Sequence, residues 1–258
     1  MKVLKFGGTS VGSAQRMKDV AKLIVGEKNL IVLSAMSGTT NSLVEISDYL
    51  YKKNPDGANE IINKLSQKYF GHIDELYATE EYKEKARELV TFHFDHIRSF
   101  TKDLFTLFEE KVVLAQGELI STGMMNLYLQ EQGVNSVLLP ALDFMRTDKN
   151  AEPDPVYIKE KLNRLLEENA GADLYITQGY ICRNAYGEID NLQRGGSDYT
   201  ASLIGAAIKA EEIQIWTDID GMHNNDPRFV KGTSPVRHLH FEEAAELAYF
   251  GAKILNPT

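Results

Sequence analysis

The sequence has one cysteine and no long apolar run. Cys182 cannot form a disulfide within the chain or build a thiolate metal cluster alone, so we expect a small buried side chain. No apolar stretch reaches the length of a membrane-spanning helix. The N-terminal segment MKVLKFGG reaches glycine too early for the apolar part of a signal peptide. We therefore expect a cytoplasmic protein that does not bind a membrane.

Basic residues are scarce: 28 Lys and Arg face 37 Asp and Glu, for a formal net charge of −9. No run of Lys or Arg forms the basic stripe that a nucleic-acid binder usually needs. An acidic protein that handles anionic ligands must gather its cations locally, so the Lys and Arg residues of the glycine-rich segments are the ones to examine. The length of 258 residues suits one large α/β domain or two lobes.

Apolar periodicity predicts strands that alternate with helices along the chain. The expected strands cover 2–6, 30–35, 137–139, 174–177 and 213–217. The expected helices cover 13–25, 41–53, 117–132, 156–169, 197–209 and 241–250. This alternation predicts an α/β fold with an open, mainly parallel sheet sandwiched by helices. Ligands of such sheets bind beyond the carboxyl ends of the strands, where the glycine and polar clusters of this sequence fall.

The segment from about 55 to 110 is rich in Glu, Lys, Tyr and Phe and has no strand pattern. We interpret it as a helical insertion whose aromatic residues form its own core. These aromatic residues are Tyr69, Phe70, Phe92, Phe94, Phe100, Phe105 and Phe108. His93 and His96 stand three residues apart without a third metal ligand nearby, so we expect both on a helix surface.

The first glycine-rich segment, KFGGTSVG at 5–12, leads from a strand into a helix capped by Ser13. Glycines allow a ligand to approach the backbone, the helix N-terminus favours an anion, and Lys5 adds a full charge. The segment fits neither the Walker A spacing nor GxGxxG. Phosphate binding and a tight turn beside an exposed lysine explain it about equally well.

A second segment, RGGSDYTA at 194–201, also places glycines before a helix start. Asp198 or Ser197 would serve as the helix cap in the simplest interpretation. Arg194 adds a guanidinium that can bind a planar anion in a bidentate manner. The pattern therefore favours a second anion site at the same edge of the sheet.

The third segment, TDIDGMHNNDPR at 217–228, begins at a predicted strand end. Its acidic spacing invites comparison with an EF-hand loop, but no glutamate stands at the twelfth position. A nucleotide-binding loop fits better, with Asp218 for a hydroxyl or a metal-bound water and Arg228 for phosphate.

These segments occur with VLSAMSGTTN at 32–41, GELIST at 117–122, RTDKNAEPD at 146–154, TQGYI at 177–181 and FEEAAELAYFGAKIL at 241–255. In this order they resemble the aspartokinases, over almost the whole chain outside the helical insertion. The resemblance implies the amino-acid-kinase fold. It also implies ATP-dependent phosphorylation of the side-chain carboxylate of L-aspartate, the first step of lysine, threonine and methionine biosynthesis, with Mg²⁺ as cofactor.

The resemblance also assigns residues by motif. Those expected around the aspartate and the γ-phosphate are Lys5, Gly7, Gly8, Thr9, Ser34, Thr40, Glu118, Arg194, Gly196, Ser197 and Asp198. Those expected around the nucleotide are Thr217, Asp218, His223, Arg228 and Lys253. Lys5 would stabilise charge on the phosphoryl group, Arg194 and Ser197 would bind the substrate carboxylate, and Asp198 would orient groups or the metal ion. No residue is assigned as a direct metal ligand.

The family pattern divides the chain into an amino-acid-binding lobe at about 1–190, with the insertion at about 55–110, and an ATP-binding lobe at about 191–258. It implies that this second lobe is truncated, that the regulatory domains are absent, and that any homodimer is weakened. His223 replaces a common tyrosine, and Asn256 replaces a common histidine. Two alternatives stay open: another kinase of this fold, acting on glutamate, acetylglutamate or carbamate, and a sensor that binds ATP or an amino acid without turnover.

Overall fold

A five-stranded parallel sheet lies at the centre of the computed structural model, which describes residues 1–102, 104–193, 195–218, 220–226 and 229–250. The strand order is β3-β4-β2-β1-β7, and every pairing in this sheet is parallel. The strands are β1 (Lys2–Phe6), β2 (Asn29–Leu33), β3 (Ser136–Leu138), β4 (Leu174–Gln178) and β7 (Ile213–Trp216). The predicted mainly parallel α/β sheet is confirmed.

Alternation along β1 directs its apolar side chains to the two faces of the sheet. Leu4 and Phe6 pack into the core on one face, and Val3 packs into the core on the other. The neighbouring strands β2 and β4 are buried along their whole length, as expected for central parallel strands. In this register Lys5 pairs with Val32 of β2 and Ile215 of β7, close to the carboxyl edge of the sheet.

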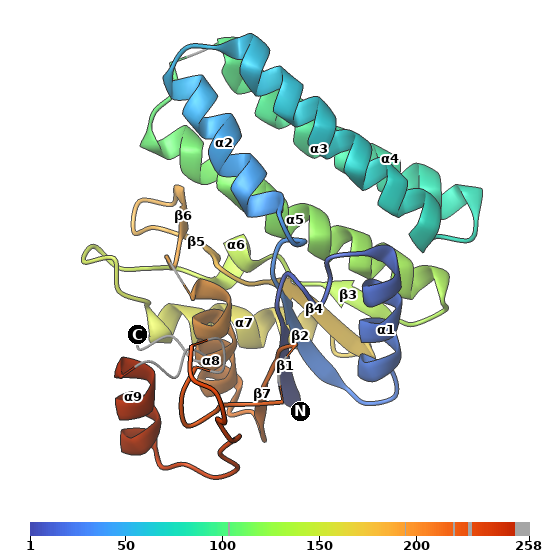
Figure 1. The fold of residues 1–258 in the computed structure, drawn as a ribbon. Helices are drawn as coiled ribbons and strands as arrows, with labels where there is room; N and C mark the ends of the chain where they lie inside the picture. Colours follow the sequence, from blue (N-terminus) through green and yellow to red (C-terminus); the bar gives the residue numbers. More distant parts are fainter. Residues whose placement is uncertain (103, 194, 219, 227–228, 251–258) are drawn as a thin grey trace.

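Helices cover both faces of the sheet (Figure 1). One face carries α1 (Ala14–Ile24) and α5 (Leu107–Glu131), and the other carries α7 (Pro155–Glu168) and α8 (Gly196–Ile208). Ser13 caps α1, because its side chain accepts a hydrogen bond from the Arg16 amide, as the sequence predicts. The parallel connections therefore give a layered α/β sandwich.

The helical insertion is confirmed. The predicted range contains α3 (Pro55–Leu76), α4 (Glu80–Ser99) and a short 3₁₀ turn, η1 (Phe100–Lys102). Here α3 packs on the preceding helix α2 (Thr39–Tyr51), and α4 packs along α5. Tyr69 and Phe94 are buried in an edge-to-face pair, as expected for the insertion's core. Phe92 and Phe108 are exposed, so that prediction was wrong for these two rings.

His93 was expected on a helix surface, and this was wrong. The residue is on α4, packs against α5 and is 9% exposed. Its Nδ1 is 2.6 Å from Gln116 Oε1, and burial lowers the pKa of the imidazole. The polar partner on α5 explains how a histidine is accommodated in the core. Among the described residues, no group of three or more His, Cys, Asp or Glu side chains could hold a metal ion.

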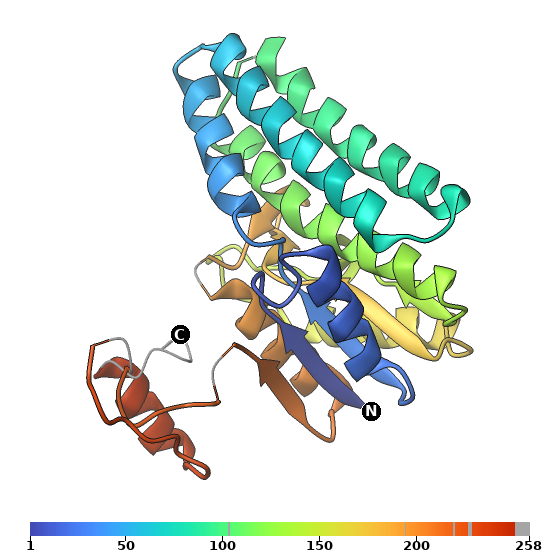
Figure 2. The same cartoon turned by 45° about the vertical axis from the view of Figure 1, so that its right-hand side comes forward.

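The sequence did not predict three short elements. These are α6 (Ala141–Phe144) and an antiparallel hairpin of β5 (Ile181–Arg183) and β6 (Ile189–Asn191). The last described helix, α9 (Phe241–Tyr249), matches its prediction and lies with its preceding loops to one side of the sheet (Figure 2). No helix in the described ranges combines the length and apolar character needed to cross a membrane.

Candidate active site

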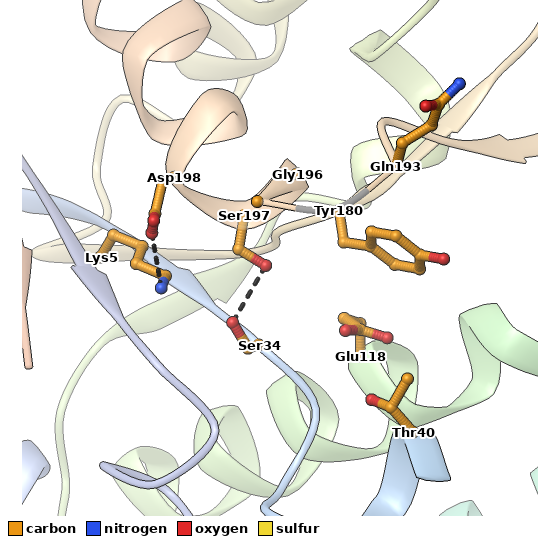
Figure 3. A pocket seen from close by; sticks show the side chains of 10 residues that line it. Lys5, Ser34, Thr40, Glu118, Tyr180, Gln193, Gly196, Ser197 and Asp198 are labelled. Carbon is orange, nitrogen blue, oxygen red and sulfur yellow. Dashed lines mark hydrogen bonds and ion pairs between the residues drawn. The ribbon is translucent and has the colours of Figure 1, made fainter. Parts of the chain in front are cut away.

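A pocket of about 470 Å³ opens at the carboxyl edge of the sheet (Figure 3). It collects side chains and backbone from β1, the ends of β2 and β4, and the helices α2, α5 and α8. Its lining residues are Lys5, Ser34, Thr40, Glu118, Tyr180, Gln193, Gly195, Gly196, Ser197 and Asp198. Seven of the predicted site residues therefore meet in one cavity: Lys5, Ser34, Thr40, Glu118, Gly196, Ser197 and Asp198.

Two polar contacts join the sheet to the first turn of α8. Lys5 Nζ lies 2.6 Å from Asp198 Oδ1, and both side chains are largely buried, with 12% and 25% of their area exposed. The contact is an ion pair. Ser34 Oγ donates to Ser197 Oγ at 2.9 Å (Figure 3). These contacts hold the end of β1 and the end of β2 against the start of α8.

Two helices begin at this pocket, and each starts after a glycine in the left-handed region. Gly195, with φ of 81°, precedes α8, and Gly38, with φ of 82°, precedes α2. A side chain would strain either backbone. Thr40 in the first turn of α2 and Ser197 in the first turn of α8 both line the cavity. The positive ends of two helix dipoles therefore face the same space, which suits an anionic ligand.

Glu118 is the buried carboxyl group of the pocket and comes from the middle of α5. Its Oε1 accepts a hydrogen bond from the Ala35 amide at 3.2 Å, and 5% of the residue is exposed. Burial raises its pKa to about 8, against the smaller opposing effect of that hydrogen bond. No cation among the described residues contributes to this shift. A ligand that brings a positive group would supply the missing counter-charge.

The glycine-rich loop after β1 borders the pocket without lining it. A Cβ at Gly8 would lie 2.6 Å from the Ala35 carbonyl oxygen, so glycine permits this loop to pack on the segment that follows β2. The Ser37 amide donates to the Gly8 carbonyl at 3.0 Å across the same contact. Gly7 lies near Lys5 Nζ, and Thr9 is exposed beside it. The loop is therefore open to a phosphate group that approaches Lys5.

Sequence reasoning missed Tyr180, Gln193 and Gly195 as pocket residues. Tyr180 has a φ of 69° and Gln193 a φ of 60°, unusual for side chains with a Cβ. Burial and the nearby Glu118 raise the pKa of the Tyr180 phenol to about 12, so the hydroxyl keeps its proton. The motif TQGYI contained Tyr180, but nothing in its spacing indicates that the ring points into the cavity as in Figure 3. Strained backbone of this kind often marks a functional site.

The residues predicted around the nucleotide are not brought into this cavity within the described chain. Thr217 and Asp218 are exposed after β7, and they hydrogen-bond to each other at 3.2 Å. His223 is 8% exposed, and its two ring nitrogens contact Asp220 Oδ1 at 2.6 Å and Thr233 Oγ1 at 3.0 Å. Arg194, Arg228 and Lys253 lie outside the described residues, so their predicted roles stay predictions.

Comparison with known proteins gives the family. The family model described as "Amino acid kinase family" matches residues 1–258, and the chain belongs to that family. It is 34% identical over 263 residues to the lysine-sensitive aspartokinase 3 of Escherichia coli, covering 99% of this chain and 57% of that protein. It is 35% identical over 272 residues to the chloroplastic aspartokinase 3 of Arabidopsis thaliana, covering 99% of this chain and 47% of that protein.

A solved structure agrees with these relatives. The crystal structure of E. coli aspartokinase III in complex with aspartate and ADP matches all of this chain and 58% of its own, with a TM-score of 0.88 and 32% identity. The chain thus spans about half the length of the curated relatives that it matches.

Proposed function

We propose that this protein is the catalytic part of an aspartokinase, which transfers the γ-phosphoryl group of ATP to the side-chain carboxylate of L-aspartate. The observation that carries the proposal is the arrangement of charge in the pocket. Glu118 stands unpaired by any described cation on one wall, and the first turns of α2 and α8 face the same cavity. An amino acid with one ammonium and two carboxylates matches these three features.

In this arrangement the ammonium group of aspartate lies towards Glu118. One carboxylate lies at the first turn of α8, where Ser197 binds it, and the other faces Lys5; the family motif implies that Arg194 binds the first carboxylate as well. Thr40 and Tyr180 close the remaining walls of a cavity whose volume of about 470 Å³ suits a small amino acid beside a phosphoryl group. The aspartate and ADP named in the related E. coli structure are consistent with this pair of ligands.

The reaction needs charge neutralisation more than a base. A carboxylate is already ionised at neutral pH, so the attacking oxygen does not have to lose a proton. The obstacle is the approach of one anion to another, and catalysis depends on alignment and on cations around the phosphoryl oxygens. Lys5 supplies such a cation once it exchanges part of its contact with Asp198 for the phosphoryl oxygens.

Mg²⁺ would arrive with ATP and neutralise part of the triphosphate charge. Asp198 fits a role beside that ion, because its carboxylate lines the pocket and already faces a cation. Gly7, Gly8, Thr9 and Gly196 would approach the phosphates with their backbone. Thr217, Asp218, His223, Arg228 and Lys253 would bind the rest of the nucleotide, in a second lobe that begins near residue 191.

The test is a substrate panel with hydroxylamine, which converts an acyl phosphate into a coloured hydroxamate. The protein is incubated with Mg-ATP and L-aspartate, L-glutamate or N-acetylglutamate in parallel. A signal with L-aspartate alone is the expected result. A signal with another acid alone would show that this acid, and not L-aspartate, is the substrate. A folded protein that binds ATP without forming any hydroxamate would favour the alternative of a sensor without turnover.

Lys5→Ala tests the assigned chemistry. The variant is expected to lose at least about a hundredfold in turnover, because a cation at the transferring phosphoryl group acts mainly in the transition state. Its Kd for L-aspartate, measured by calorimetry, should change much less. Unchanged turnover would remove Lys5 from the mechanism, and Lys2→Ala, which changes a partly exposed lysine on the same strand, is the matched control.

A further inference from the structure

Three residues at the end of β4, Gln178, Gly179 and Tyr180, lie between the two helices that carry the walls of the pocket. Glu118 is on α5, and Gly196 and Ser197 begin α8. Figure 3 shows Glu118 on one side, Gly196 and Ser197 on the other, and the Tyr180 ring between them. The inference that follows rests on the proposed function, because it concerns the binding of the amino-acid substrate.

On the α5 side, a threonine hydroxyl joins this segment to Glu118. Gln178 Nε2 donates to Thr122 Oγ1 at 2.7 Å, and Thr122 Oγ1 donates to the Glu118 carbonyl at 2.7 Å. The other end of the same amide is also used, because the Ala141 amide donates to Gln178 Oε1 at 2.7 Å. Gln178 is 1% exposed and Thr122 0% exposed, so water does not compete for these bonds.

On the α8 side, a second threonine makes the same connection. The Tyr180 amide donates to Thr200 Oγ1 at 3.0 Å, and Thr200 Oγ1 donates to the Gly196 carbonyl at 2.7 Å. Thr200 is 0% exposed. Between the two bridges, Gly179 approaches so closely that a Cβ there would lie 2.5 Å from Ser197 Oγ.

Each bridge uses its threonine hydroxyl both as an acceptor and as a donor. A threonine hydroxyl carries one proton and can accept through its lone pairs, so each one accepts from the strand segment and donates to a helix carbonyl. Glu118 and Gly196 are pocket residues, whereas Thr122 and Thr200 are absent from the cavity lining. Neither threonine was singled out by its sequence motif for this role.

We propose that Thr122 and Thr200 are positioning residues, which fix the Glu118 wall and the first turn of α8 at the separation that spans the amino-acid substrate. Both threonines bond to the same segment, 178–180, which therefore fixes the two walls relative to each other. Loss of either bridge frees one wall to shift, and the ammonium and carboxylate of the ligand can no longer be bound together in the best geometry.

Thr177 of β4 provides a matched control. It is 0% exposed, directly precedes Gln178, and its Oγ1 has no hydrogen-bond partner within the described part of the chain. Thr→Val is the same chemical change at all three positions. At Thr177 it removes a hydroxyl that makes no bond to the described residues, and at Thr122 or Thr200 it removes one that makes at least two.

The experiment measures Kd values for L-aspartate and for ADP by calorimetry in the three Val variants and in Thr122→Ser and Thr200→Ser. Thr122→Val and Thr200→Val are expected to bind L-aspartate about three- to tenfold more weakly, the range for loss of a typical hydrogen bond. Their affinity for ADP should stay within about twofold, because in the proposed arrangement only the γ-phosphoryl group, which ADP lacks, would reach Gly196. The Ser variants should recover the affinity, and Thr177→Val should match the wild type.

Several outcomes would overturn the proposal. These are Val variants at 122 and 200 that bind L-aspartate like the wild type, Ser variants as weak as the Val variants, or an equal loss of ADP affinity. If Thr122→Val does not fold, Gln178→Met breaks the same bridge from the strand side and carries the same expectation. A wild type that binds no L-aspartate would overturn the proposed function and this inference together, whereas normal binding by wild type and Val variants would overturn the inference alone.

Discussion

The raised pKa of Glu118 predicts how the stability of the protein depends on pH. The side chain is fully buried, and its pKa of about 8 compares with an ordinary value of 4.5. The folded protein therefore keeps a proton on Glu118 across a pH range in which the unfolded chain has lost it. The stabilisation is complete below pH 4.5, falls as the pH rises, and is lost by about pH 8.

The size of the effect follows from proton linkage. One bound proton changes the free energy of unfolding by about 1.4 kcal/mol per pH unit, so Glu118 alone removes about 2.5 kcal/mol between pH 5.5 and pH 7.5. Glu118→Gln replaces the carboxyl group with a neutral amide of similar shape. The variant should lack this contribution. Its free energy of unfolding should therefore rise relative to that of the wild type by about 2.5 kcal/mol between pH 5.5 and pH 7.5.

The assay is urea denaturation of both proteins at several pH values without ligand. Subtracting the two free energies of unfolding cancels every other titrating group, including His72 and His93, whose pKa values are lowered by burial. Glu84→Gln removes a carboxylate at an exposed position and serves as the control. If Glu118→Gln and the wild type lose stability in parallel, Glu118 is ionised in the folded protein and the argument for its unpaired, protonated state fails.

Three further predictions follow from particular contacts. Binding of L-aspartate near pH 7 should release up to about one proton, because an ammonium beside Glu118 favours the ionised carboxylate. Calorimetry in buffers of different ionisation heat measures the release, and Glu118→Gln should show none. Gly179→Ala should weaken L-aspartate binding at least about tenfold, since its Cβ meets Ser197, and unchanged affinity would contradict that close approach. The wild type should lose stability below about pH 6.5, because burial lowers the pKa of His93 and the unfolded chain binds the proton more readily. In urea denaturation His93→Asn should reduce this loss. An identical pH profile would show that His93 does not titrate on unfolding.

The sheet was predictable because its signal is local. Buried β2 and β4 appear as continuous apolar runs, and Ser13 marks the start of α1. The hairpin β5–β6 was missed, since its strands of three residues are too short to show a period. The start of α5 was placed too late, although Thr106 and Glu109 form a capping box there.

The motifs predicted which residues form the pocket better than they predicted how those residues are arranged. Lys5 and Asp198 stand in glycine-rich segments at strand ends, which mark anion sites, whereas Glu118 was assigned through the family resemblance alone. The motifs could not show that Glu118 has no cationic partner among the described residues, since pairing depends on which helices face each other. Tyr180 was missed for a related reason: its direction depends on a positive φ that a sequence does not display.

The identity of the trapped product tests the central claim most directly. L-Aspartate, Mg-ATP and hydroxylamine are incubated with the protein, and the hydroxamate is identified by NMR against the two synthetic isomers. We predict the β-hydroxamate, formed in equal amount to ADP and absent with Lys5→Ala. The α-hydroxamate, or ADP formed without any hydroxamate, would contradict phosphorylation of the side-chain carboxylate in this pocket.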